Sequence, residues 1–110
     1  KILKMNLVNP DLTSIKYRRR KIKVTYKNLG DCYGMYDPNK HILYIDQNIK
    51  DERLFNTIMH ELFHIIIYNE KIDVNKKGEE PIAQTVGDGY TRIFKQNPNL
   101  WDILKDCLFE

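Results

Sequence analysis

The sequence is poor in cysteine, and the two it has exclude two common uses of this residue. Cys32 and Cys107 lie far apart in a chain of 110 residues and form no Cys-x-x-Cys spacing. A disulfide framework in so small a chain needs more cysteines than this. We therefore interpret both as reduced thiols, which predicts a cytoplasmic protein.

Long apolar runs and a strong net charge are also missing. The longest apolar stretch surrounds Ile65-Ile66-Ile67, far short of the roughly 20 residues that span a membrane. The formal net charge is +3, too small to indicate a nucleic-acid partner. Basic residues gather in segment 16–23, which predicts either an anion-binding surface or a solvated strand edge. We predict one domain over residues 1–110, without a membrane partner or direct nucleic-acid binding.

Alternation of apolar and polar residues predicts strands in the first half of the chain. Between the last two strands, Asp37-Pro38 opens a turn, because proline presets φ at the second turn position. We expect the strands to form a small antiparallel sheet. They cover residues 22–26, 33–36 and 41–45.

The pattern changes to a helical period after residue 50. Asp51 is predicted to cap a helix over 52–68, and Pro81 lies in the first turn of a second helix that ends near Gln96. A short third helix follows residue 99, and Asp11 is predicted to cap a short helix ending near residue 17. The expected fold is α+β and zincin-like, with the small antiparallel sheet packed against the first two long helices.

The segment His60-Glu61-Leu62-Phe63-His64 is a His-Glu-x-x-His motif. Two histidines at i and i+4 share a helix face, so their imidazoles can bind one Zn²⁺. Glu61 lies about 100° round the helix, where it can take a proton from water whose pKa the metal has lowered. The motif therefore predicts a zinc site with His60 and His64 as ligands and Glu61 as general base.

The rest of the predicted helix supports this interpretation. Its polar positions fall on one narrow arc, whereas nearly all other positions are apolar. A helix of that kind is buried, and its polar stripe faces a cleft. The alternative is a core histidine pair satisfied by hydrogen bonds, which explains neither Glu61 nor the stripe. The arc contains Thr57, His60, Glu61, His64 and Tyr68.

A catalytic zinc site needs a third protein ligand. Glu80 is preferred, because Ala83, Gln84 and Gly87 follow on its own helix face and would allow a close approach to the motif helix. Glu79 remains a rival. Acids in a first helical turn are also favoured by the helix dipole alone, so a purely structural role stays open for both.

Together, these residues resemble a compact gluzincin. Tyr33-Gly34-x-Tyr36-Asp37, then Ile42-x-Tyr44-Ile45-Asp46, the His-Glu-x-x-His helix and the glutamate helix resemble the ImmA/IrrE-type metallopeptidases, especially their short phage and prophage versions. The resemblance covers roughly residues 21–96. It implies zinc held by His60, His64 and Glu80, with Glu61 catalytic, and an intracellular protein substrate that is a DNA-binding regulator.

Two functions follow from these patterns. The first is peptide-bond hydrolysis, with the substrate aligned on an edge strand such as 41–46 and with Tyr68 or Tyr90 as candidate donors to the oxyanion. The second is a non-catalytic zinc-stabilised module that binds a regulatory protein. Glu61 favours the enzyme, because a structural zinc site needs no base.

Overall fold

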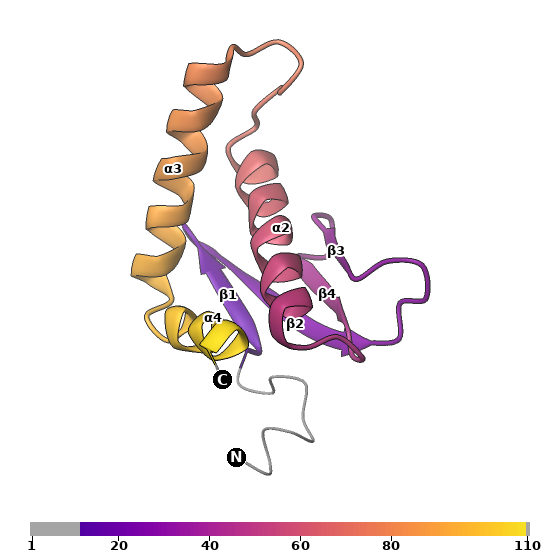
Figure 1. Cartoon of the computed structure of the whole chain (residues 1–110). Coiled ribbons are helices and arrows are strands. Elements are labelled where there is room, and N and C mark those ends of the chain that lie inside the picture. The colour runs from indigo at the N-terminus through magenta and orange to yellow at the C-terminus, as the bar shows by residue number, and fades with distance from the viewer. Residues whose placement is uncertain (1–11, 110) are drawn as a thin grey trace.

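The computed structural model describes residues 12–109. Within this range four strands come first and three helices follow, in the order that Figure 1 shows. This order confirms the predicted α+β class. The elements are β1 (Ser14–Tyr17), β2 (Arg20–Lys27), β3 (Gly34–Asp37), β4 (Ile42–Asp46), α2 (Asp51–Asn69), α3 (Glu79–Gln96) and α4 (Leu100–Phe109).

The sheet is mixed, so the predicted antiparallel sheet is wrong at its centre. The strand order is β1-β2-β4-β3, in which β2 and β4 run parallel and the two outer pairs run antiparallel. Strand β4 is one of the two inner strands, and its Leu43 and Ile45 are fully buried. Strand β3 has no fully buried residue, and it forms an edge. Burial alone does not set the strand order, because β1 is also an edge strand and has two buried side chains, Ile15 and Tyr17.

Strand β1 replaces the short helix predicted to end near residue 17. The predicted cap, Asp11, lies outside the described residues, but Ser14–Tyr17 is a strand that pairs with β2. Ile15 and Tyr17 alternate with polar residues and are buried. The turn between the strands contains Arg18 at φ 55°. No glycine or asparagine marks it, so the usual sequence signal of a tight hairpin is missing.

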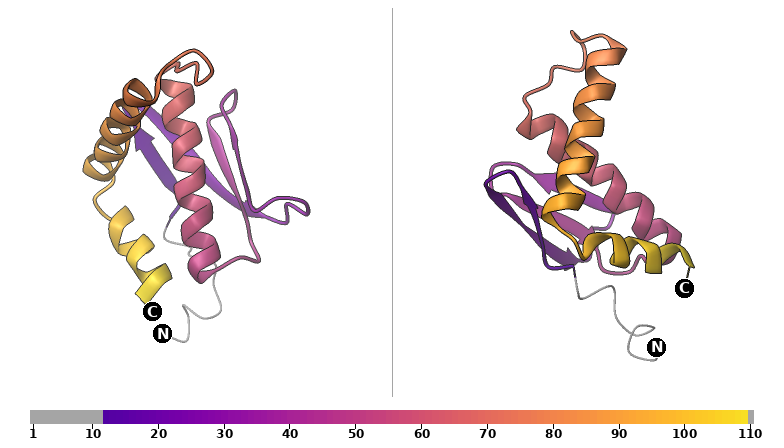
Figure 2. Two further views of the ribbon diagram at one scale, coloured as in Figure 1. Left: turned by 45° about the horizontal axis from the view of Figure 1, so that its top comes forward. Right: turned by 90° about the vertical axis from the view of Figure 1, so that its left-hand side faces the viewer.

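Helix α2 crosses one face of the sheet, with α3 on one side of it and β3 on the other (Figures 1 and 2). It begins at Asp51 and ends at Asn69, close to the predicted 52–68, although its N-cap is Lys50 rather than Asp51. None of the described helices is long and apolar enough to cross a membrane. The core between α2 and the sheet contains Ile22, Leu43, Ile45, Ile58, Leu62 and Ile65, all fully buried.

Side-chain amides at the end of α3 cover the outer edge of β1. Asn97 Oδ1 accepts the Lys16 N–H at 2.8 Å, and Asn97 Nδ2 donates to the Lys16 C=O at 2.9 Å. Gln96 repeats this pairing with the N–H and C=O of Arg18, at 2.7 and 2.8 Å. The two amides therefore take the place of a further strand, which leaves β3 as the edge strand whose outer side borders α2.

Candidate metal centre

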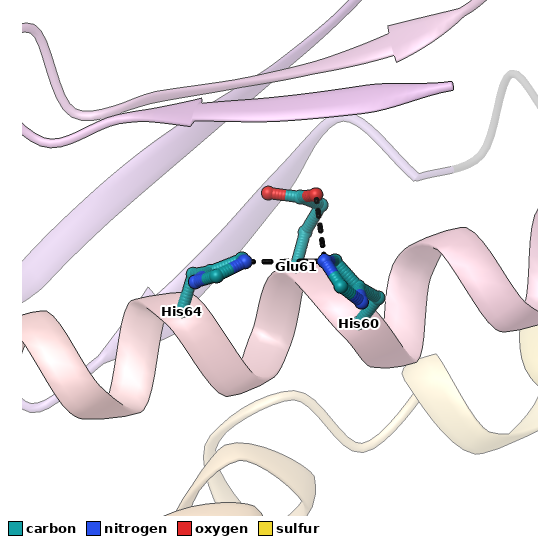
Figure 3. Close-up of side chains that lie close together, drawn as sticks. All are labelled: His60, Glu61 and His64. Atoms are coloured by element: carbon teal, nitrogen blue, oxygen red, sulfur yellow. Dashed lines mark hydrogen bonds and ion pairs between the residues drawn. The ribbon is translucent and has the colours of Figure 1, made fainter. Parts of the chain in front are cut away.

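The two motif histidines converge on one point. They lie one turn apart on α2, and their Nε2 atoms are 3.1 Å apart (Figure 3). Two zinc–nitrogen bonds of about 2.0–2.1 Å at a tetrahedral angle place the nitrogens about 3.3 Å apart. Both rings are exposed on the solvent side of the helix. Their geometry and chemistry therefore fit a zinc ion held by His60 and His64.

Glu61 lies beside this pair but points inward, toward the strands (Figure 3). It is only 5% exposed, and its Oε2 lies 4.0 Å from His60 Nε2. His60, Glu61 and His64 are called the metal group below. Their possible ligand atoms all lie within 4.8 Å of one another. A carboxylate at this position can bind a proton next to the metal without being a required ligand.

The surroundings of Glu61 adjust its proton affinity. Burial raises the pKa of its carboxyl above the usual glutamate value, while His64, His60 and the backbone N–H of Tyr36 oppose that rise. A general base works best when its pKa is close to the operating pH. The Tyr36 N–H faces this carboxylate from β3 and favours its charged form.

Gly34 allows β3 to approach the motif helix this closely. A Cβ atom at residue 34 would lie 2.7 Å from Thr57 Cγ2 and 3.1 Å from Glu61 Cγ. A contact of 2.7 Å between carbon atoms is essentially never observed, so any other residue here would force the strand or the Thr57 side chain to shift. Sequence reasoning assigned no role to this glycine. A glycine inside a strand pattern is nevertheless a known sign of close backbone approach.

The two glutamates of the next helix lie outside the group. Glu79 and Glu80 are exposed in the first turn of α3, and neither belongs to the set of described residues that could hold a metal together. Their role as ligands therefore stays a prediction.

The prediction that the helix face following Glu80 packs against α2 is wrong. Ala83, Gln84 and Gly87 are exposed, and a Cβ at Gly87 would meet no atom within 4 Å. Helix α3 instead contacts α2 through Gly89, where a Cβ would lie 2.6 Å from Ile66 Cγ2. The buried residues of α3, Gly89 and Ile93, mark the face that turns inward.

Other residues considered from the sequence have different neighbours. Tyr90 donates its hydroxyl to the Met59 carbonyl at 2.7 Å, so this donor is engaged within the α2–α3 contact. His41 lies 2.7 Å from an Arg20 nitrogen, outside the metal group. Arg18, in the basic segment, is paired with Glu70. Of the two tyrosines, Tyr68 is the one that lines the groove at the metal centre.

That groove runs along one side of α2 and includes the metal centre. Its volume is about 700 Å³, and the motif residues form one wall. Strand β3 with the turn after it forms the second wall, and the C-terminal end of α2 closes the far end. The His-Glu-x-x-His motif could be predicted from the sequence, whereas the wall formed by β3 becomes apparent only in the fold.

Comparison of the chain with protein-family models, curated proteins and solved structures gave no match. The geometry of this centre is therefore the basis for assigning a function.

Proposed function

We propose that this protein is a zinc-dependent metallopeptidase similar to the ImmA/IrrE-type gluzincins. One observation carries the proposal. Two imidazole nitrogens 3.1 Å apart lie beside a buried carboxylate, at the point where an edge strand borders the helix. A metal, a base and a place for an extended peptide are thus adjacent, as peptide hydrolysis requires.

Each residue has a defined task in this proposal. His60 and His64 would hold the zinc, with Glu80 as the expected third ligand. A bound zinc supplies Lewis-acid polarisation of the substrate carbonyl and lowers the pKa of water. Glu61 accepts a proton from the attacking water and passes it to the leaving amine. The Tyr36 N–H holds the Glu61 carboxylate in place between these two transfers.

The expected docking strand has to be revised, because β4 is central in the sheet. Tyr33 C=O accepts the Asp46 N–H, so odd-numbered residues of β3 bond to β4. The N–H and C=O groups of Gly34 and Tyr36 point away from β4, because hydrogen-bonding groups alternate in direction along an antiparallel pair. The Gly34 peptide groups and the Tyr36 carbonyl would therefore align an extended substrate by β-augmentation.

The substrate class follows from the resemblance alone. It is a DNA-binding regulator cut inside the cell, in a phage or prophage setting. A cytoplasmic location agrees with two cysteines that form no disulfide within residues 12–109, of which Cys32 is exposed.

A second candidate is a zinc-stabilised module that binds a peptide without cutting it. The position of Glu79 and Glu80 outside the metal group leaves both candidates short of ligands, because a catalytic zinc site needs three protein ligands and a structural one needs four. The burial of Glu61 favours the enzyme. A purely structural site would not need a desolvated carboxylate beside it.

The replacement of Glu61 by Gln separates the two functions. The zinc-loaded variant should keep its metal and fold but lose cleavage of a peptide library by 10²-fold or more, roughly the contribution of a general base. Metal content and circular dichroism provide the control. Equal cleavage by the variant and the wild type would exclude Glu61 as the base, and no cleavage by either would favour the binding module.

A further inference from the structure

The groove continues past His64 along the C-terminal end of α2, and its walls there are apolar. Tyr68 and Met35 are 48% and 46% exposed, although large apolar side chains usually avoid water. The rings of Tyr36 and Tyr68 meet edge to face at 6.2 Å. This part of the groove is lined by Met35, Tyr36, Pro38, Ile67, Tyr68 and Ile72.

The end of the groove is built by the way α2 terminates. The Ile72 N–H donates to the Ile67 carbonyl at 3.1 Å, and the Lys71 N–H donates to the Tyr68 carbonyl at 3.2 Å. These two bonds form a Schellman motif, in which the residue after the cap is left-handed and is usually glycine. Here that residue is Lys71, with φ 57°. The motif folds Ile72 back toward the groove.

A lysine in this conformation costs stability that glycine would not. Its side chain nevertheless lines the groove, and within residues 12–109 it takes part in none of the ion pairs. Apart from the motif residues, it is the charged residue of the lining. Lys71 thus places a positive charge at the far end of the apolar part of the groove.

We propose that the groove selects peptides with a bulky apolar residue near the scissile bond and an acidic residue beyond it, bound by Lys71. This inference rests on the proposed site. Lys71 follows His64 by seven residues, which is about 10 Å along a helix. An extended peptide covers that distance in about three residues. The acidic residue should therefore lie about three positions from the scissile bond, with the apolar one between.

The first test measures binding, without cleavage. Zinc-loaded Glu61→Gln protein is titrated with two fluorescein-labelled peptides that differ only by Glu or Gln, two positions from a phenylalanine. The Glu peptide should bind about 5- to 10-fold more tightly, as expected for one charged pair at a partly exposed site. Lys71→Gly should abolish this ratio, and Lys71→Glu should reverse it.

Controls separate recognition from folding. Lys71→Gly should raise the melting temperature, because glycine fits the left-handed position. Lys77→Gly removes an exposed lysine of the same linker and should leave the binding ratio unchanged. The proposal is overturned if Lys71→Gly keeps the Glu preference, or if neither peptide binds.

The second test maps cleavage of a peptide library by wild-type protein, with Glu61→Gln as background. Bulky apolar residues should be enriched beside the cut, and acidic residues about three positions away on the same side. Cuts without either preference would refute the proposed selectivity. Charge-selective binding without any cleavage would support the groove and refute the peptidase proposal, so the two failures can be told apart.

Discussion

The missing side chain at Gly34 sets the distance between β3 and α2. A methyl group there would overlap Thr57 Cγ2 at 2.7 Å and press on Glu61. Thr57 is itself buried and β-branched, so its methyl group has little freedom to move. One glycine thus positions the edge strand against the base.

Gly34→Ala should therefore lower the free energy of unfolding by ~1–3 kcal/mol, the usual cost of overpacking. It should also reduce peptide cleavage, because the Tyr36 N–H moves away from Glu61. Chemical denaturation and peptide cleavage measure the two effects. Thr57→Ser removes the opposing methyl group, so the double variant should recover much of the loss. Additive losses in the double variant would show that this contact is not the cause.

Glu80 supplies a second test at this scale. If the first turn of α3 contributes the third ligand, Glu80→Ala should weaken zinc binding by about tenfold or more, whereas Glu79→Ala should change it little. Competition with a chromophoric chelator measures both affinities. Equal losses in the two variants, or no loss in either, would contradict the assignment.

The predictability of the site differs from residue to residue. The motif residues could be predicted because two histidines at i and i+4 share a helix face in any fold. The role of Gly34 and the Tyr36 N–H could not, because it depends on which strand lies beside α2. The strained Lys71 could not be found either, since the sequence there has no glycine to mark the helix end.

Helix α3 was predicted as a helix, but the face that it turns toward α2 was predicted wrongly. Its bounds were predicted well, but its small residues were assigned to the wrong face. Gly89 is buried against Ile66, while Gly87 faces open space. Apolar residues carry most of the energy of helix packing, so they decide which side of α3 turns inward.

The two glycines make a matched pair of variants. Gly89→Ala should cost ~1–3 kcal/mol by overpacking, because the fully buried and β-branched Ile66 cannot move aside. Gly87→Ala should instead stabilise by ~0.5–1 kcal/mol, the helix propensity gain at an open site. Urea denaturation of both variants checks the signs. A stabilising Gly89→Ala would contradict the α2–α3 packing described above.

The sheet shows what local patterns leave undetermined. Three of its four strands were predictable from alternation, but their order was not. Strand β4 lies between β2 and β3, although it follows β3 in the chain. Strand order depends on burial across the whole core, and the period of each strand does not encode it.

For the molecule as a whole, the metal should couple to folding. A domain of this size has modest stability of its own, and a ligand at 100 times its Kd adds about 2.7 kcal/mol. Such a gain corresponds to roughly 10 °C or more in melting temperature for about 100 residues. A chelator should therefore lower the melting temperature of the zinc-loaded protein by that amount.

His64→Ala should abolish this response, because one imidazole cannot hold the zinc. His41→Ala should retain it, since His41 lies outside the metal group. Differential scanning calorimetry with and without chelator measures all three proteins. The zinc site is refuted if the wild-type protein purifies without metal and its melting temperature does not change when the chelator is added.

The amides of Gln96 and Asn97 have a consequence for self-association. A sheet with two open edges can add copies at both ends and grow into a fibre. Here the Lys16 and Arg18 peptide groups at the β1 edge are already bonded, so a further strand would pair more readily beside β3. Pairing there ends at two copies. The described sheet is therefore protected against open-ended polymerisation on one side, while the other side stays available for a peptide.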